Sequence, residues 1–349
     1  MTARTSRPHR PMLTTAGTGL ALLLAACGGA VDEAATPSTG APAGGGATTG
    51  AATDAPTEAS TDAAAESSPG ASGEAAGGFP VTVTSGQEPD TTELTIQTQP
   101  AAIVSLSPTA TEMLYAVGAG DQVVAVDSFS YFPEEAPVTD LSGFEPNVEA
   151  ILGYAPDLVI ASGDPGDLVA SLEAAGVPTL LLPSAIDLEE SYDQIERVGA
   201  ATGNVEEAAT LTEQMAADIE AAVASVPAGD PLSYYHELDP TFFTASGDTF
   251  IGQVYGLFGL ENIADATGEA YPQLSQEFIV EADPDVVFVT SGDFSATPEE
   301  ITARPGWQGI TAVQEGDVVV VDADVASRWG PRVVDFVETV AAELPEVRE

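Results

Sequence analysis

One phrase occurs twice in the sequence, and this repeat decides which fold we expect. Residues 149–164 read E-A-I-L-G-Y-A-P-D-L-V-I-A-S-G-D, and residues 277–293 read E-F-I-V-E-A-D-P-D-V-V-F-V-T-S-G-D. In each copy a glutamate precedes Pro-Asp by the same offset, and an apolar run follows. Asn147 and Ser275, which are residue types that favour a helix N-cap, stand two positions before the glutamates. The repeat predicts two similar halves, each with a helix that leads into a buried strand.

A long amphipathic helix is predicted between the two copies, at about residues 204–226. Asn204 is a suitable N-cap, and Pro227 ends the pattern. Such a helix rises about 1.5 Å per residue, so it is long enough to cross the back of two small domains. We therefore expect two lobes, residues 81–203 and 227–349, joined by one backbone helix. Apolar residues recur along it at three- and four-residue steps: Val205, Ala208, Leu211, Met215, Ile219 and Val223.

Short apolar runs alternate with helical patterns in both halves. The runs V-V-F-V at 286–289 and V-V-V-V at 318–321 are apolar throughout, as strands are when both of their faces are buried. This alternation predicts an α/β fold with two Rossmann-like lobes and mainly parallel sheets. In open sheets of this kind ligands bind beyond the carboxyl ends of the strands. The segments that follow strands are therefore the candidate binding loops.

The first 80 residues differ in composition from the rest of the chain. Residues 1–26 combine three Arg with an apolar run and small residues, which is typical of an export signal. Cys27 follows at the position that bacterial lipoproteins acylate, so we expect a lipid anchor on the outer face of the cell membrane. An incidental free thiol is the alternative. Residues 27–80 are rich in Ala, Gly, Thr, Ser, Pro and acids, which predicts a disordered tether.

The charge of the chain is extreme. The formal net charge is −47, and the chain contains no lysine. Removal of the signal would leave five Arg against 55 acidic residues. Nucleic acid is therefore excluded as a partner, because its phosphates need basic contacts. An acidic, lysine-free surface suggests a salty habitat, where dissolved ions screen the self-repulsion of the chain.

Five stretches carry a resemblance to a known family, and together they cover both halves. In them the chain resembles the periplasmic binding proteins that serve ABC importers of ferric siderophores and cobalamin. The resemblance implies a lipid-anchored monomer, without enzymatic activity or a cofactor of its own. It would bind a bulky metal chelate between its lobes and pass it to an ABC permease with its ATPase. The stretches are I-V-S-L-S-P-T-A-T-E-M-L-Y-A-V-G-A-G-D (103–121), P-N-V-E-A-I-L-G-Y-A-P-D-L-V-I (146–160), F-I-G-Q-V-Y-G-L-F-G-L-E-N-I (250–263), Y-P-Q-L-S-Q-E-F-I-V-E-A-D-P-D (271–285) and R-W-G-P-R-V-V (328–334).

The two glutamates of the repeat, Glu149 and Glu277, fall in the first turns of their predicted helices. Interaction with the helix dipole explains an acid there, at roughly 0.3–1 kcal/mol each, and duplication of one half explains the shared offset. In the resembled family one glutamate on each lobe pairs with arginines of the permease. By this resemblance Glu149 and Glu277 are permease-docking residues. The competing hypothesis is a surface hydrolase that uses them as paired carboxylates.

Residues 324–332 (D-V-A-S-R-W-G-P-R) contain two of the five Arg that would remain after signal removal. The planar fork of Arg328 suits carboxylate, phosphate or catecholate oxygens, and the resembled cobalamin binders carry an Asp and an Arg facing the ligand at the positions of Asp324 and Arg328. For Arg332 we expect a structural role, with Asp335 as its local partner. Aromatic residues near the ends of predicted strands complete the candidate ligand site, with packing beneath the loops as the alternative for each: Phe129, Tyr131, Phe144, Tyr235, Phe243, Tyr271 and Trp329.

His236 is the only histidine that follows the predicted signal. With one His and one Cys, a zinc site of the usual ligands is not available. Haem is the alternative ligand, and it would need His236 or a tyrosine as its axial ligand. A serine-hydrolase elbow G-x-S-x-G does not occur in the sequence. The residues alone do not choose among ferric siderophore, haem and cobalamin.

Overall fold

The computed structural model describes residues 78–292 and 295–347. The predicted signal, Cys27 and nearly all of the predicted tether lie outside these residues. We call β1 to α4 the N-lobe and β7 to α11 the C-lobe. The N-lobe contains β1 (Val81–Gln87), β2 (Asp90–Ile96), β3 (Ile103–Leu106), α1 (Pro108–Ala116), η1 (Gly120–Gln122), β4 (Val123–Val126), α2 (Val148–Leu152), β5 (Leu158–Ala161), α3 (Leu168–Ala174), β6 (Thr179–Leu181) and α4 (Leu188–Thr202).

A single helix, α5 (Val205–Ser225), leads from the N-lobe to the C-lobe. The C-lobe contains β7 (Ser233–Glu237), α6 (Phe250–Gly256), β8 (Glu261–Asn262), η2 (Ile263–Thr267), α7 (Gln276–Ala282), β9 (Val286–Thr290), α8 (Pro298–Ala303), η3 (Trp307–Gly309), α9 (Thr311–Glu315), β10 (Val318–Val321), α10 (Ala323–Ser327) and α11 (Val333–Val347).

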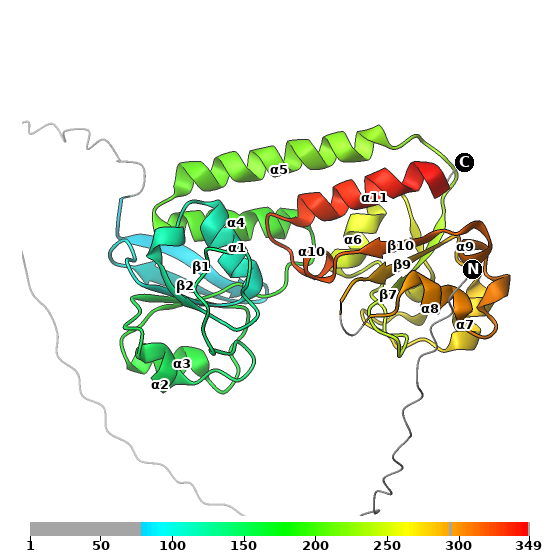
Figure 1. The fold of residues 1–349 in the computed structure, drawn as a ribbon. Helices are drawn as coiled ribbons and strands as arrows, with labels where there is room; N and C mark the ends of the chain where they lie inside the picture. The colour runs from blue at the N-terminus through cyan, green and yellow to red at the C-terminus, as the bar shows by residue number, and fades with distance from the viewer. Residues whose placement is uncertain (1–77, 293–294, 348–349) are drawn as a thin grey trace, which may run out of the picture. The chain divides into compact units, whose positions relative to one another are not determined.

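Each lobe is built on a parallel sheet, as predicted. The N-lobe sheet has the strand order β4-β3-β5-β6, and the C-lobe sheet has the order β10-β9-β7-β8. All of their strand pairs are parallel, which confirms the α/β fold of two Rossmann-like lobes (Figure 1). The hairpin of β1 and β2 is antiparallel and packs against α4 and β6.

The central strands are apolar throughout because both faces of each sheet are covered. On β5, Leu158 and Ile160 belong to one buried cluster, whereas Val159 and Ala161 belong to another on the opposite face. Side chains alternate between the two faces of a strand, so a strand covered on both sides needs apolar residues at every position. β9 follows the same rule in the C-lobe.

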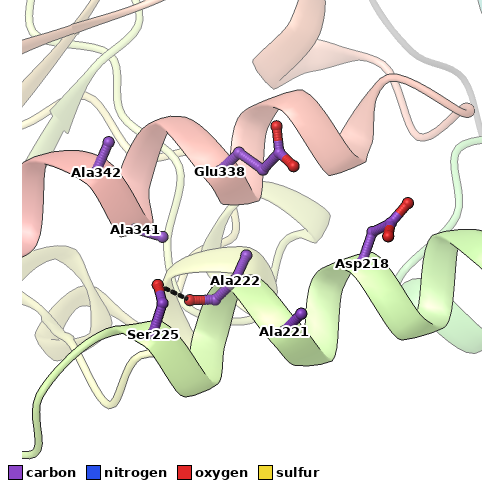
Figure 2. Close-up of a pocket in the computed structure, with 7 residues that line it drawn as sticks. All are labelled: Asp218, Ala221, Ala222, Ser225, Glu338, Ala341 and Ala342. Atoms are coloured by element: carbon purple, nitrogen blue, oxygen red, sulfur yellow. Dashed lines mark hydrogen bonds between the residues drawn. The ribbon is translucent and has the colours of Figure 1, made fainter.

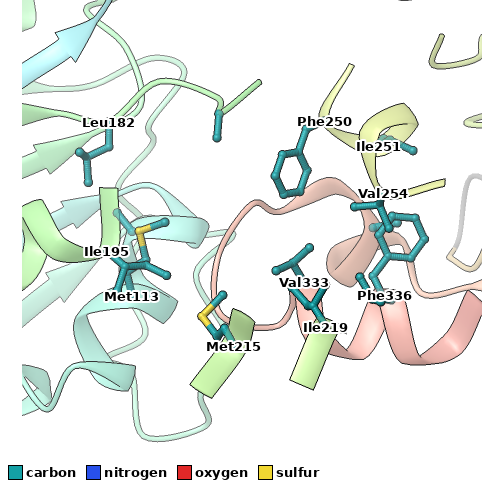
Figure 3. Close-up of a cluster of buried hydrophobic side chains, with 14 of the residues drawn as sticks. Met113, Leu182, Ile195, Met215, Ile219, Phe250, Ile251, Val254, Val333 and Phe336 are labelled. Atoms are coloured by element: carbon teal, nitrogen blue, oxygen red, sulfur yellow. The ribbon is translucent and has the colours of Figure 1, made fainter. Parts of the chain in front are cut away.

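Helix α5 is the backbone that joins the lobes, and it packs against α4 along its amino-terminal half and against α11 along its carboxyl-terminal half. Its Met215 lies in a single apolar cluster that runs from Met113 and Ile195 of the N-lobe to Val333 and Phe336 of the C-lobe (Figure 3). One continuous core therefore joins the two lobes. Among the helices of the described residues, none is both long and apolar enough to cross a membrane.

Small residues line the contact between α5 and α11. Ala221 and Ala222 of α5 and Ala341 and Ala342 of α11 border a shallow groove of about 330 Å³ (Figure 2). Alanine side chains let the two helix backbones approach closely at this groove, while larger side chains such as Ile219 and Val333 belong to the core that α5 and α11 share. This groove lies among the backbone helices and contains none of the predicted ligand residues.

Two features of the helices differ from expectation. Asn204 is the N-cap residue of α5, but its side chain makes no capping bond and instead donates from Nδ2 to Thr202 Oγ1 at 2.9 Å. Helix α10 was not predicted, and it forms where we expected a loop after β10. It brings Asp324 and Arg328 one helical turn apart, where they form a salt bridge.

The crossing of α4 over α5 generates a testable prediction at Gly199. A Cβ atom there would lie 2.3 Å from Ala208 Cβ, so Gly199→Ala should force the helices apart. We expect the free energy of unfolding, measured in urea, to fall by about 1–3 kcal/mol. Gly256→Ala in α6 is the control, because its Cβ would meet no atom within 4 Å. That change should be neutral or stabilising by up to about 1 kcal/mol. Equal stability of the two variants would contradict the close packing of α4 against α5 at Gly199.

Candidate functional site

Two candidate binding segments from different lobes meet in this fold. Residues 127–132 follow the carboxyl end of β4, and residues 324–332 follow the carboxyl end of β10. Arg328 Nη2 donates to the backbone oxygen of Phe129 at 3.3 Å, and the Tyr131 hydroxyl donates to Asp324. We call these two segments, together with Glu112, the inter-lobe seam. It lies where open parallel sheets bind ligands.

The centre of the seam is the carboxylate of Glu112, on α1 of the N-lobe, which is only 3% exposed. Arg328 Nη1 donates to its Oε1 at 2.6 Å, while Arg332 donates through Nε to Oε2 at 3.0 Å and through Nη2 to Oε1 at 2.6 Å. The hydrogen bond with Glu112 raises the pKa of Arg332. A charge buried this deeply requires such partners, because desolvation costs several kcal/mol per ion.

Arg328 is itself 6% exposed and uses its guanidinium fully within the protein. Besides Glu112 and Phe129, it binds Asp324 Oδ1 at 3.0 Å and stacks over the ring of Tyr131 at 5.2 Å. Arg332 stacks over the ring of Phe132 at 4.2 Å. Both cations are thus neutralised by carboxylates and lie against aromatic rings.

Trp329 attaches the same segment to α4 of the N-lobe. Its Nε1 donates to Gln194 Oε1 at 2.9 Å, and its backbone oxygen accepts a bond from Ser191 Oγ at 2.5 Å. Its indole is partly buried against the core that joins the two lobes. In this structure Trp329 is an inter-lobe contact, and its role as a ligand contact stays a prediction.

Two predicted aromatic residues of the N-lobe lie together at the surface. Phe129 is half exposed and Phe144 is 77% exposed, and their rings are in edge-to-face contact at 5.9 Å. The chain reaches this position through Gly143, where a Cβ would lie 2.2 Å from the oxygen of Leu106 at the end of β3. Only glycine lets this loop pass so close to the strand.

Two further predicted aromatic residues, Phe243 and Tyr271, lie on neighbouring segments of the C-lobe. Phe243 pairs with Gln273 in an isolated antiparallel bridge, and Thr244 N donates to Pro272 O at 3.1 Å. Both rings are exposed to a substantial extent, and partial burial raises the pKa of Tyr271. The structure therefore brings Phe129 close to Phe144 on the N-lobe and the segments of Phe243 and Tyr271 together on the C-lobe. Tyr131 and Asp324 meet across the seam.

The prediction that Tyr235 contacts the ligand is wrong. Tyr235 is fully buried, packs edge-on against Trp307 at 6.2 Å and lies in the core on the outer face of the C-lobe sheet. Burial raises its pKa well above the ordinary value of tyrosine. The physical reason is that β7 is a central strand covered on both faces, so Tyr234 and Tyr235 each point into a core.

His236 lies on the same strand and is also fully buried. Its Nδ1 is 2.8 Å from the Tyr255 hydroxyl, and burial lowers the pKa of His236 to about 3. The imidazole is therefore neutral at pH 7 and cannot reach a bound ligand. Among the described residues there is also no cluster of three or more metal-ligating side chains.

One expectation about the arginines also changes. Arg332 pairs with Glu112 of the other lobe and not with Asp335, because the start of α11 faces α1. Glu112 itself was not recognised from the sequence. A signal was present, since it is the one acid within the otherwise uncharged run 108–119, P-T-A-T-E-M-L-Y-A-V-G-A. That Arg328 contacts a ligand stays a prediction.

Glu149 and Glu277 occupy equivalent and exposed positions on two helices. Asn147 and Ser275 cap these helices by accepting bonds at 3.1 Å from Ala150 N and Phe278 N, as the repeat predicted. Helix α2 belongs to the N-lobe and α7 to the C-lobe, and Figure 1 shows them well apart. The two carboxylates therefore do not form a catalytic pair in one site.

Known proteins share this fold and much of this sequence. Residues 103–325 match a family model described as periplasmic binding protein. The chain belongs to the periplasmic binding protein family. An uncharacterized ABC transporter substrate-binding lipoprotein of Bacillus subtilis is 32% identical over 277 residues, which cover 76% of this chain and 86% of the relative.

Two further members of the family are similar to this chain and have a named ligand. A cobalamin-binding protein of Halobacterium salinarum is 35% identical over 272 residues, which cover 74% of this chain and 72% of the relative. The crystal structure of the periplasmic vitamin B12 binding protein of Vibrio cholerae superimposes with a TM-score of 0.60 at 30% identity. This match covers 71% of this chain and 98% of that one.

The buried carboxylate of the seam gives a prediction about stability. Glu112→Gln keeps the size of the side chain but leaves Arg328 and Arg332 without their anionic partner in the N-lobe. We expect the free energy of unfolding in urea to fall by about 3–5 kcal/mol. In the control Asp193→Asn, loss of the ion pair between the half-exposed Asp193 and Arg197 should cost at most about 1 kcal/mol. Similar small losses in both variants would show that the seam is not a structural ion-pair network.

Proposed function

We propose that this protein captures a cobalt corrinoid of the cobalamin type at the inter-lobe seam and delivers it to an ABC permease. The observation that carries the proposal is the combination of exposed aromatic rings with arginines that are already neutralised. Phe129, Phe144 and Tyr131 offer apolar surface beside Arg328 and Arg332, whose charges are balanced by carboxylates. Such a surface suits a large ligand with apolar faces and little net charge.

The charge balance argues against the anionic members of the same ligand class. Four Arg and no Lys lie in the described residues, and each of these Arg is in a salt bridge with Asp or Glu. Ferric catecholates carry several negative charges, and haem carries two carboxylates. Either would have to break an existing ion pair to gain a cationic partner. A corrinoid has neutral amide groups around its rim and requires no such exchange.

The metal chemistry supports the same choice. Cobalamin carries its own axial ligands, a tethered benzimidazole base and an upper ligand, so the protein need not supply one. Haem bound by a protein usually has an axial His, Cys, Met or Tyr. His236 is buried and hydrogen-bonded in the core, which leaves an exposed tyrosine such as Tyr131 or Tyr271 for that role. Two relatives, those of Halobacterium salinarum and Vibrio cholerae, are called cobalamin- and vitamin B12-binding proteins.

Delivery to a permease follows from the family and from the exposed glutamates. The Bacillus subtilis relative is named as an ABC transporter substrate-binding lipoprotein. Glu149 and Glu277 would bind arginines of the permease, one from each lobe, and such charge pairs set the orientation of the complex. Acylation of Cys27 would hold a single copy at the outer face of the membrane, with residues 27–80 as the tether.

A panel of ligands tests the corrinoid assignment. We expect cyanocobalamin to bind at least ten times more tightly than haemin, ferrichrome or a ferric tris-catecholate, measured by isothermal titration calorimetry. The physical reason is that haemin and the ferric tris-catecholate are anionic and would compete for the Glu112 ion pairs, whereas neutral ferrichrome lacks the broad apolar faces that the aromatic rings of the seam would cover. Tighter binding of haemin or of either ferric complex than of cyanocobalamin would overturn the corrinoid assignment. The family assignment would not change.

Aromatic variants test the position of the site. Phe129→Ala and Phe144→Ala should each weaken cyanocobalamin binding about tenfold, which corresponds to about 1.4 kcal/mol. Tyr154→Ala is the matched control. Tyr154 is an exposed aromatic residue that precedes the amino end of β5, whereas the seam lies beyond the carboxyl ends of the strands. If the control weakens binding as much as the other two variants, the ligand does not lie at the seam.

A double variant tests permease docking separately from ligand capture. Glu149→Ala with Glu277→Ala should abolish cobalamin uptake by cells, because the anchoring charges are lost, while calorimetry should give an unchanged ligand affinity. Glu189→Ala with Glu281→Ala removes two other exposed acids, one from each lobe, and should leave uptake normal. Loss of ligand affinity in the Glu149 and Glu277 variant would show that these glutamates belong to the ligand site.

A further inference from the structure

A second binding groove lies on the N-lobe, apart from the seam. It has a volume of about 790 Å³ and lies between β2 on one side and α3 with β6 on the other. None of the seam residues or predicted ligand aromatics lines it. We propose that this groove binds a small amphipathic organic cation. The proposal is independent of the function proposed above, because the two sites share no residue.

The floor of the groove is apolar and of suitable size. Leu94 and Ile96 of β2 face Val169, Val177 and Leu181 across it. Small-molecule sites in proteins have volumes of about 300–1,000 Å³ and mostly apolar walls with a few polar anchors. The volume of the groove lies within this range. Its apolar floor fits the apolar body of a small molecule, and the rest of its lining is mostly polar or acidic.

The charge around the groove selects for a cation. Five carboxylates line it, and no Arg or His is among its lining residues. Asp157 uses both oxygens to accept bonds from Ala101 N and Ala102 N, and Asp164 accepts one from Val169 N. The other three, Asp90, Glu93 and Glu173, are exposed and make no hydrogen bond or ion pair within the described residues. These three carboxylates are free to bind a cationic group.

A buried hydroxyl without a partner marks the inner wall of the groove. Thr179, on the edge strand β6, is 5% exposed, and its Oγ1 has no hydrogen-bond partner among the described residues. By contrast, the hydroxyl of Ser85 on the neighbouring wall accepts a bond from Leu181 N at 2.9 Å. A buried hydroxyl without a hydrogen-bond partner is destabilising. A ligand with an N–H group or an acceptor oxygen would satisfy it after a small movement of the side chains that cover Thr179 Oγ1.

The three features together define the ligand by its chemistry. It has an apolar body that covers Leu94 and Val177, a hydrogen-bonding group that reaches Thr179, and a positive charge near Glu93 and Glu173. A bare metal ion would not use the apolar floor. A planar aromatic cation with amino groups, such as a diaminoacridinium, satisfies all three requirements.

Proflavine, a fluorescent diaminoacridinium, is the probe for the test. In low salt we expect saturable binding of one proflavine per protein, with 1-anilinonaphthalene-8-sulfonate, an anion of similar size, bound at least ten times more weakly. Thr179→Val keeps the shape of the side chain and should weaken proflavine at least fivefold, whereas Thr179→Ser should restore most of the affinity. Saturating cyanocobalamin should not displace the probe.

Charge variants separate the groove from the general acidity of the protein. Glu93→Gln with Glu173→Gln should weaken proflavine at least fivefold. Glu206→Gln with Glu207→Gln removes the same charge from exposed positions on α5 and should change the affinity less than twofold. Equal losses in both pairs, or unchanged affinity in a folded Thr179→Val variant, would overturn the proposal. If Thr179→Val does not fold, as judged by circular dichroism, the comparison of the two double glutamate variants alone tests the proposal.

Discussion

The rest of the structure depends on one buried carboxylate, that of Glu112, which binds two arginines from the other lobe. Arg328 and Arg332 both donate to it, and Arg328 also bonds to the backbone of the 127–132 segment. Because these charges are buried, each requires its partners, and the two lobes cannot separate at this point without exposing or orphaning them. The same pairing removes free positive charge from the site. In the function that we propose, recognition falls to the exposed aromatic rings on either side of the seam, and this is why we favour a ligand with little net charge.

A second constraint comes from the backbone helix. One apolar cluster continues from the N-lobe through Met215 and Ile219 of α5 into Val333 and Phe336 of α11. Closely packed interiors resist gradual deformation, so α5 and this cluster together oppose large changes in the angle between the lobes. Ligand capture by this protein should involve small movements of loops such as 127–132 and little rotation of whole lobes. Glu149 and Glu277 would then keep a nearly fixed separation, which suits docking to two matching sites on a permease.

The repeated phrase, the apolar strands and the stripe along α5 were sufficient to predict the two parallel sheets and the helix that joins them. The N-caps Asn147 and Ser275 were predicted for the same reason, since a cap depends only on residues three positions apart. The site was less predictable. The exposed Phe129 and Phe144 lie together as loop aromatics should, but Tyr235 is in the core. The local sequence around a strand tyrosine is the same whether other elements cover that face of the sheet or leave it open. Only the layers above and below the sheet determine whether the tyrosine is buried or exposed.

The sequence by itself determined the α/β class, the order of the elements, the acidic charge and the equivalence of the two glutamates. All of these follow from patterns within about twenty residues or from composition. The tertiary structure decided the partners of the charged groups. Glu112 lies 216 positions before Arg328 and 220 before Arg332, and no local pattern encodes a contact at that separation. Which carboxylate neutralises which arginine depends on how α5 positions one lobe against the other. That arrangement is set by the packing of the whole core.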